Sequence, residues 1–256
     1  MKNTRTGWFA TAEESHQHSL KTLNRLYEYD DFMDSVSTVA DMGYGSGLDL
    51  EWWATRTTRD DTPRPLNIKC WGIDRDHGAR RIEQYANVSY VDQDFEDSIQ
   101  CRRPLDVVWS HNSFQYAVNP LATLANWWHA MGTNGMLVVI VPQTTNLVYN
   151  LQEFEQRDSV YFHWSMVSLI HCLAVSGFDC ASGFFRKDIQ DPWLHAIVYK
   201  SEHEPMDPKT TRWYDLRDRG LLPTTAADSV FKWGFLRQKD LILPWVDKML
   251  YGFGSQ

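Results

Sequence analysis

The sequence predicts an α/β protein with a doubly wound, mostly parallel sheet of seven strands. Short apolar segments alternate with segments of helical periodicity along most of the chain, and the segment 136–141 is apolar throughout. Such a run suits a central strand covered on both faces, and alternation of strands with helices favours a parallel sheet. A glycine-rich turn at 43–47 directly follows the first apolar run, as expected where a strand leads into a ligand-binding loop.

The amino-terminal half is expected to contribute four of these strands. Thr11 and Glu14 match a capping box, which opens an amphipathic helix that ends near the acidic residues 30–34. A polar, proline-broken segment at 59–65 indicates a long loop. The expected order after the first helix is strand 38–42, helix 48–57, strand 68–73, helix 78–85, strand 88–91 and strand 105–110.

The carboxy-terminal half is expected to complete the sheet with an antiparallel hairpin at its edge. The expected order is helix 120–131, strand 136–141, helix 161–176, strand 178–185 and strand 193–199. The last two strands flank a turn-like segment, which predicts the hairpin. We therefore divide the chain into an amino-terminal helical cap (1–34), a central domain (35–200) and a carboxy-terminal extension (201–256).

Composition indicates a globular protein of the cytoplasm. At 256 residues and 43% hydrophobic content, the chain can bury a substantial core. Its four cysteines show neither a C-x-x-C pair nor the spacing of a disulfide-rich scaffold, and no uncharged apolar run reaches the roughly 18 residues that span a bilayer. The net charge of −8 disfavours nucleic acid as a partner, because such binding depends on clustered Lys and Arg.

The stretch from Asp41 to Gly47 carries the most specific chemical signal in the sequence. An acidic residue ends an apolar run, and glycines follow at every second position. Glycine adopts left-handed backbone angles and lets a ligand approach without a Cβ in the way. A dinucleotide-binding fingerprint would need a third glycine where this chain has Leu48, so that alternative fits poorly.

The pattern Asp41-x-Gly43-x-Gly45-x-Gly47 instead resembles motif I of the class I S-adenosylmethionine-dependent methyltransferases, in particular the group that acts on small molecules. The resemblance continues in order to the edge hairpin. It implies a Rossmann-like methyltransferase fold for 35–200, with S-adenosyl-L-methionine as cofactor and S-adenosyl-L-homocysteine as product.

The resemblance also assigns roles to residues just after each strand, where open α/β sheets bind ligands. It gives Asp74 the ribose hydroxyls, Asp94 the adenine amino group and Phe95 the adenine ring, although 92–97 also fits a solvated acidic turn. The cofactor-binding residues that it implies are Asp41, Gly43, Tyr44, Gly45, Gly47, Asp74, Arg75, Asp94, Phe95, Ser110 and His111.

A general base is needed only if the attacking atom carries a proton, and His111 is the predicted base. The alternative for His111 is a packed, hydrogen-bonded histidine. Tyr161 and His163 on the next helix are predicted substrate contacts. No metal site is expected, because the pair His16 and His18 is interpreted as part of a surface helix, and structural zinc needs more ligands.

The predicted function is methyl transfer to an oxygen, nitrogen or carbon of a small molecule. Two alternatives stay open: a nucleic-acid methyltransferase that uses the extension, and a non-catalytic module that binds the cofactor. Basic and aromatic residues interleave at 205–240, which favours packing or a lid over nucleic-acid binding. An interface between copies in a homo-oligomer would look the same.

Overall fold

A computed structural model describes most of the chain. The described residues are 11–29, 31–59, 61–75, 85–99, 101, 103–142, 162, 164–187 and 193–222. Their elements are α1 (Ala12–Tyr29), η1 (Asp31–Ser35), β1 (Thr38–Met42), α2 (Leu48–Ala54), β2 (Lys69–Asp74), β3 (Val88–Asp92), β4 (Leu105–His111), η2 (Phe114–Tyr116), α3 (Pro120–Ala130), β5 (Met131–Pro142), α5 (Met166–Val175), β6 (Phe178–Lys187), β7 (Trp193–Lys200) and α6 (Trp213–Asp218).

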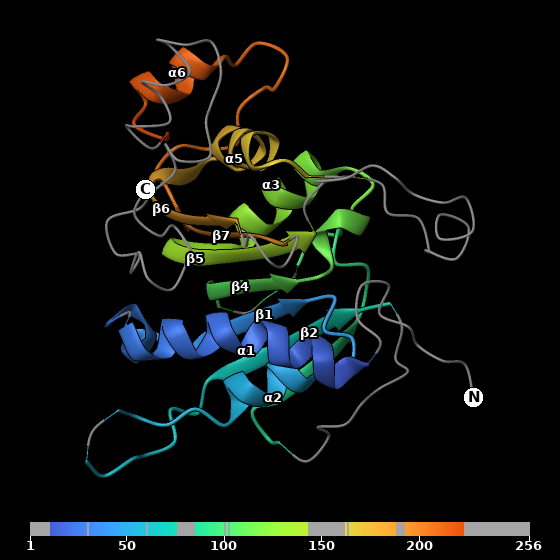
Figure 1. The fold of residues 1–256 in the computed structure, drawn as a ribbon, viewed down its shortest axis with the longest axis vertical. Coiled ribbons are helices and arrows are strands. Elements are labelled where there is room, and N and C mark those ends of the chain that lie inside the picture. The colour runs from blue at the N-terminus through green and yellow to red at the C-terminus, as the bar shows by residue number, and fades with distance from the viewer. Residues whose placement is uncertain are drawn as a thin grey trace, which may run out of the picture.

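The strands form one seven-stranded sheet in the order β3-β2-β1-β4-β5-β7-β6. The first five strands pair in parallel, and β7 runs antiparallel to both of its neighbours. The predicted fold class is therefore confirmed, including the antiparallel hairpin. The crossover through α5 places β6 at the edge and leaves a position for β7 between β5 and β6 (Figure 1).

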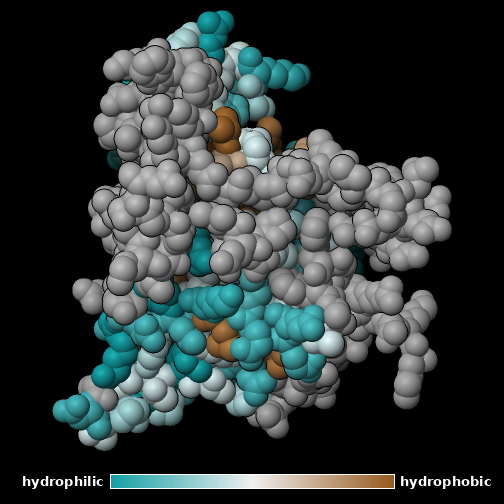
Figure 2. Space-filling view, viewed as in Figure 1, coloured by the Kyte–Doolittle hydropathy of each residue, from teal (hydrophilic) through white to brown (hydrophobic). Residues whose placement is uncertain are grey.

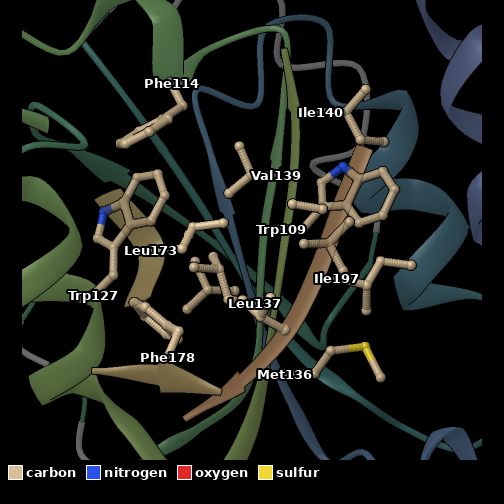
Figure 3. Packing of buried hydrophobic residues seen from close by; sticks show 14 of the residues in the cluster. Trp109, Phe114, Trp127, Met136, Leu137, Val139, Ile140, Leu173, Phe178 and Ile197 are labelled. Atoms are coloured by element: carbon tan, nitrogen blue, oxygen red, sulfur yellow. The ribbon is translucent and has the colours of Figure 1, made fainter. Parts of the chain in front are cut away.

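Side chains from the central strands pack on both faces of the sheet. Leu137 and Val139 of β5 point toward the aromatic residues of η2 and α3, whereas Met136 and Ile140 point to the opposite face with Trp109 of β4 (Figure 3). All five are fully buried. This two-sided burial is the reason that the sequence of β5 is apolar without alternation.

Two groups of helices provide this cover. α1 packs against α2, while α3 and α6 both pack against α5 (Figure 1). Leu23 and Leu26 of α1 are buried in the core, so the amino-terminal helix is an integral layer of the fold. The described surface over α1 and α2 is mostly hydrophilic, with small hydrophobic patches between the polar side chains (Figure 2).

Several predicted boundaries need correction. The helix expected over 161–176 begins only at Met166, because Ser165 and Ser168 form a capping box and the Phe162 amide donates to Gln115. The helix expected over 48–57 ends at Ala54. The helix expected over 78–85 falls almost entirely on 76–84, which lies outside the described residues.

The described part of the carboxy-terminal extension, 201–222, packs onto the central domain. The Met206 amide donates to the carbonyl of Val175 in α5, and the Cys180 amide of β6 donates to Leu221. Leu216 of α6, Leu221 and Leu222 are buried in the same core as the sheet. This part of the extension therefore belongs to the same folded body.

Candidate active site

A cavity of about 340 Å³ lies at the carboxyl ends of β1, β2 and β4. This is the edge at which open parallel sheets bind ligands, and the volume suits a small-molecule site. The predicted cofactor residues that line the cavity are Asp41, Gly43, Tyr44, Gly45, Asp74, Arg75, Phe95 and His111. Gly47, Asp94 and Ser110 do not line it.

The loop after β1 has the backbone that its glycines allow. Gly43, Gly45 and Gly47 all have positive φ, at 75°, 52° and 79°, where other residues are strained. A Cβ on Gly43 would lie 2.6 Å from the Cβ of Ser113, whereas a Cβ on Gly45 would meet nothing closer than a carbonyl oxygen at 4.0 Å. Gly43 is thus required by packing, and Gly45 leaves open space beside the cavity.

Two predicted carboxylates face this loop from the ends of β1 and β2. Asp74 accepts a hydrogen bond from the Gly45 amide, at 3.1 Å to Oδ2. Asp41 is buried, and its Oδ2 has no hydrogen-bond partner among the described residues. Burial, and secondarily the charges of Asp49 and Asp74, raise the pKa of Asp41 well above its usual range. A cationic or hydrogen-donating ligand would relieve this unsatisfied acid.

The acidic segment after β3 is ordered around Phe95. Phe95 is buried at the cavity wall, and its carbonyl accepts a hydrogen bond from the indole of Trp127. Asp94 lies behind the lining, where Oδ2 is 3.1 Å from Nη1 of Arg75 and Oδ1 accepts the Glu96 amide. An adenine contact from Asp94 would therefore require its ion pair with Arg75 to rearrange, so the role predicted for Asp94 stays a prediction.

The remaining predicted residues divide into packed and undescribed ones. Ser110 is fully buried, and its hydroxyl lies 2.8 Å from the hydroxyl of Ser113, which donates to the carbonyl of Met42. Ser110 thus supports the loop from behind. Tyr161 and His163, the predicted substrate contacts, lie outside the described residues.

His111 touches the cavity, but other side chains face both of its ring nitrogens. Nε2 lies 3.0 Å from Nδ1 of His18, and Nδ1 lies 3.6 Å from Oδ2 of Asp49. Its side chain is only 5% exposed, and burial lowers its pKa. This environment matches the packed, hydrogen-bonded alternative better than a freely accessible base.

The interpretation of His16 and His18 as surface residues was wrong. His18 is buried among His111, Trp193 and His195, and burial lowers its pKa to about 3. His16 lines the cavity and places Nδ1 2.6 Å from Oδ1 of Asp49. The two imidazoles do point to different sides of α1, but both sides are covered by the fold.

Asp49 is the centre of the polar network that sequence reasoning missed. It is buried in the first turn of α2 and accepts hydrogen bonds from His16, Ser19 and the indole of Trp109. Burial alone would raise the pKa of Asp49, but the hydrogen bonds from His16 and Ser19 and the nearby His111 lower it overall. An acidic residue two positions after the last glycine of the motif was the one signal in the sequence that could have pointed to Asp49. Within the described ranges, no cluster of His, Cys, Asp and Glu is arranged to hold a metal ion.

Known structures of the same fold are found among methyltransferases, although neither a family model nor a curated protein sequence matches the chain. One similar chain comes from a complex between the Haloferax volcanii Trm112 methyltransferase activator and a protein named as a methyltransferase. It is 18% identical, with a TM-score of 0.54 over 77% of this chain and 98% of that one.

Two further structures support the same assignment of fold. A protein from Listeria monocytogenes, named as an S-adenosylmethionine-dependent methyltransferase, is 17% identical, with a TM-score of 0.51 over 74% of this chain and 100% of that one. The N-methyltransferase NodS of Bradyrhizobium japonicum, solved with S-adenosyl-L-homocysteine, is 14% identical, with a TM-score of 0.51 over 73% and 88%. The chain therefore has the fold of class I S-adenosylmethionine-dependent methyltransferases.

Proposed function

We propose that this protein is an S-adenosylmethionine-dependent methyltransferase that modifies an oxygen, nitrogen or carbon of a small molecule. The observation that carries the proposal is the cavity at the ends of β1, β2 and β4, where a bare glycine loop meets Asp41, Asp74 and Phe95. The fold, which is shared with known methyltransferases, supports it. Fold alone does not define an activity, so the argument depends on the residues of this site.

The chemistry of the lining suits the proposed cofactor. S-adenosyl-L-methionine carries a cationic sulfonium and an ammonium group, and the unpartnered Oδ2 of buried Asp41 is an acceptor that such a cation would satisfy. Asp74 stands at the end of β2, where a ribose can be held, and Phe95 offers an apolar ring to an adenine. Bound in this way, the cofactor would supply an electrophilic methyl group.

Some features of the proposed enzyme follow from the rest of the molecule. We propose that 1–34 covers the cofactor, since Ala12, Ser15 and His16 of α1 border the cavity. We propose 35–200 as the catalytic domain, because these residues contain all seven strands and most of the cavity lining, and 201–256 as an extension whose described part packs on that domain. No described helix has both the length and the apolar character needed to cross a membrane. All four cysteines are free thiols, which supports the proposed cytoplasmic location.

Calorimetric titration tests the cofactor. We expect heat of binding with S-adenosyl-L-methionine and S-adenosyl-L-homocysteine and none with NAD. Asp74→Asn should weaken binding of both, because one acceptor for the ribose becomes an amide. The matched control is Asp97→Asn, which makes the same change in charge at an exposed position after the neighbouring strand β3, outside the cavity lining, and should bind as the wild type does. Binding of NAD alone would overturn the proposal.

Transfer from methyl-labelled S-adenosyl-L-methionine into a cell extract tests the activity. We expect label in the small-molecule fraction, and we expect prior nuclease treatment of the extract to change nothing. Label that is lost after nuclease treatment would instead identify a nucleic-acid substrate. Binding without any transfer would identify a non-catalytic module.

A further inference from the structure

We propose that His16, held by Asp49, is the general base of this enzyme and that its acceptor is a hydroxyl-bearing small molecule. This inference rests on the proposed methyltransferase function and goes beyond it by assigning the proton acceptor and the acceptor class. The base comes from the amino-terminal helix α1, not from the sheet.

The contact between His16 and Asp49 fixes the tautomer of the imidazole. Oδ1 of Asp49 lies 2.6 Å from Nδ1 of His16, and the same carboxylate accepts hydrogen bonds from Ser19 and Trp109. An ionised carboxylate only accepts hydrogen bonds, so the proton of a neutral His16 ring resides on Nδ1. Nε2 is then left with its lone pair, and no described residue is hydrogen-bonded to it.

The position of His16 gives that lone pair access to substrate. His16 lines the cavity and its side chain is 17% exposed, whereas its partner Asp49 is 11% exposed. Asp49 also lines the cavity, but its carboxylate is occupied by His16, Ser19 and Trp109, which leaves the imidazole as the basic group that faces the substrate. An imidazole oriented from behind by a buried carboxylate is the arrangement that general-base catalysis uses to activate a hydroxyl group.

His111 is a weaker candidate for the same role. His18 and Asp49 face its two nitrogens, and its side chain is 5% exposed. We assign His111 a structural part, since it lies between Asp49 and the buried His18 and His195. The two histidines thus separate into a solvent-accessible base and a buried support.

The reaction balances without any further reagent. The acceptor oxygen forms a bond to the methyl carbon while its O–H proton moves to Nε2 of His16. The electron pair of the breaking carbon–sulfur bond stays on sulfur, which becomes a neutral thioether. His16 becomes an imidazolium ion beside the Asp49 carboxylate, and later releases its proton to water. A neutral amine attacks through its own lone pair and can release its proton to water afterwards, whereas a neutral hydroxyl group is a weak nucleophile until a base takes its proton. A base at this position therefore favours a hydroxyl group as the acceptor.

Two variants test the base by transfer of labelled methyl into the small-molecule fraction of a cell extract. We expect His16→Ala to lower the rate by at least about 100-fold, the usual contribution of a positioned general base, while its affinity for S-adenosyl-L-methionine, measured by calorimetry, falls by a much smaller factor. Added imidazole should restore part of the rate of His16→Ala. Gln17→Ala, an exposed neighbour on the same helix, should behave as the wild type does.

Asp49 is a positioning residue, and its effect should appear in the pH profile. The wild-type rate should fall on the acid side as the base takes up a proton, and that limb should be absent from His16→Ala. Asp49→Asn should move this acid limb of the profile to lower pH, because the amide no longer stabilises the imidazolium ion. A general structural defect would lower the rate at every pH and leave the limb in place, whereas loss of the carboxylate's charge moves the limb.

A chemical probe tests the accessible imidazole without any acceptor. Diethyl pyrocarbonate acylates neutral imidazole nitrogens, and peptide mass mapping locates the product. We expect His16 to react faster than His111, and more slowly in Asp49→Asn than in the wild type. An unreactive His16 alongside a reactive His129, an exposed histidine of α3, would overturn the proposal.

The outcomes separate this proposal from the one on which it rests. If the wild type binds the cofactor and transfers label but His16→Ala does so equally fast at every pH, the function stands and the base is wrong. If His16→Ala loses cofactor binding and thermal stability together, His16 is structural and the proposal falls. If the wild type binds without transfer, or does not bind, both the base and the enzyme are wrong.

Discussion

At the scale of single residues, the site keeps several ionisable groups buried in their neutral forms. His18, His111 and His195 are all buried, and burial lowers the pKa of each, to about 3 for His18. Asp41 is buried as an acid with a raised pKa. A fold retains such groups when packing compensates for them, and they concentrate where a protein does chemistry.

The buried histidines should make the protein sensitive to acid. In the unfolded chain they take up protons near pH 6.5, whereas the folded state resists protonation, so stability should fall as the pH drops below about 6.5. Each histidine contributes a slope of at most about 1.4 kcal/mol per pH unit. Thermal unfolding from about pH 5 to about pH 8, roughly the range over which histidine titrates, measures this dependence of stability on pH.

A pair of variants isolates one histidine. His195→Phe should reduce the acid slope, since His195 is 2% exposed and its Nε2 has no hydrogen-bond partner among the described residues. His129→Phe, at an exposed position of α3, should leave the slope unchanged. Equal slopes in the two variants and the wild type would contradict this explanation.

Asp41→Asn should separate stability from binding. The unfolded carboxyl group ionises near 3.8, but the folded one keeps its proton to much higher pH, so folding becomes less favourable as the pH rises. Asparagine cannot ionise, so the variant should gain stability relative to the wild type at pH 8 and not at pH 4. Its affinity for S-adenosyl-L-methionine should fall about tenfold or more, or about 1.4 kcal/mol, because an amide cannot ionise beside the bound cation as the carboxyl group of Asp41 can.

Thermal melts at both pH values and calorimetry check these two effects. Asp97→Asn is the control, because the same chemical change at an exposed carboxyl group should alter neither quantity. Stability curves that run parallel for Asp41→Asn and the wild type would show that Asp41 is not a buried neutral acid.

At the scale of elements, the loop between β1 and α2 has one glycine for packing and one for access. Gly43 and Gly45 both have positive φ, so alanine should cost about 1 kcal/mol at either from backbone strain alone. At Gly43 the new methyl group also meets Ser113, whose hydroxyl is tied to the carbonyl of Met42. The two positions therefore predict different phenotypes for one substitution.

We expect Gly43→Ala to be less stable than Gly45→Ala by about 1–3 kcal/mol, the usual cost of overpacking. Gly45→Ala should fold but bind S-adenosyl-L-methionine more weakly, because its methyl group enters the open space next to the cavity. Denaturant unfolding and calorimetry distinguish the two. Equal stabilities of the two variants would show that the contact with Ser113 gives way.

α1 is the other element that shapes the site. Its first turns border the cavity, and its inner face contributes Leu23 and Leu26 to the core. Contacts to α2 fix its position, among them the bond from Trp52 to Asn24 and the bonds around Asp49. A cap that is built into the core in this way can place a catalytic side chain as accurately as a strand can.

At the scale of the whole molecule, the described part of the extension is part of the core. Leu216, Leu221 and Leu222 are at most 3% exposed, and backbone bonds tie 201–222 to α5 and β6. A chain that ends at Lys200 would leave the facing surfaces of α5 and β6 uncovered. Such contiguous apolar surface promotes aggregation.

We therefore expect truncation after Lys200 to abolish soluble, cooperative folding. Leu221→Ala, a milder change, should lower the free energy of unfolding by about 2–5 kcal/mol, as other deletions of buried leucine side chains do. Soluble yield and denaturant unfolding measure these effects. A truncated chain that melts cooperatively at the wild-type temperature would mean that the extension is a separate unit.

Much of the site could be predicted because each residue follows its strand in the sequence. Asp41 lies near the end of β1, Gly43 and Gly45 are in the loop that follows, and Asp74 ends β2, so parallel strands bring them to one edge once the strands are recognised. Local spacing is sufficient for such residues, because the fold class fixes which edge they share. Element boundaries were less certain, as the start of α5 illustrates.

The sequence alone determined the sheet and the glycine loop, since periodicity and glycine placement are local properties of the chain. Only the tertiary structure decided that His16 meets Asp49 across 33 residues, that His111 is enclosed, and that the extension closes the core. These depend on which face of α1 docks on α2 and on how deeply each side chain is buried. No local pattern encodes either, because docking is a property of two surfaces together.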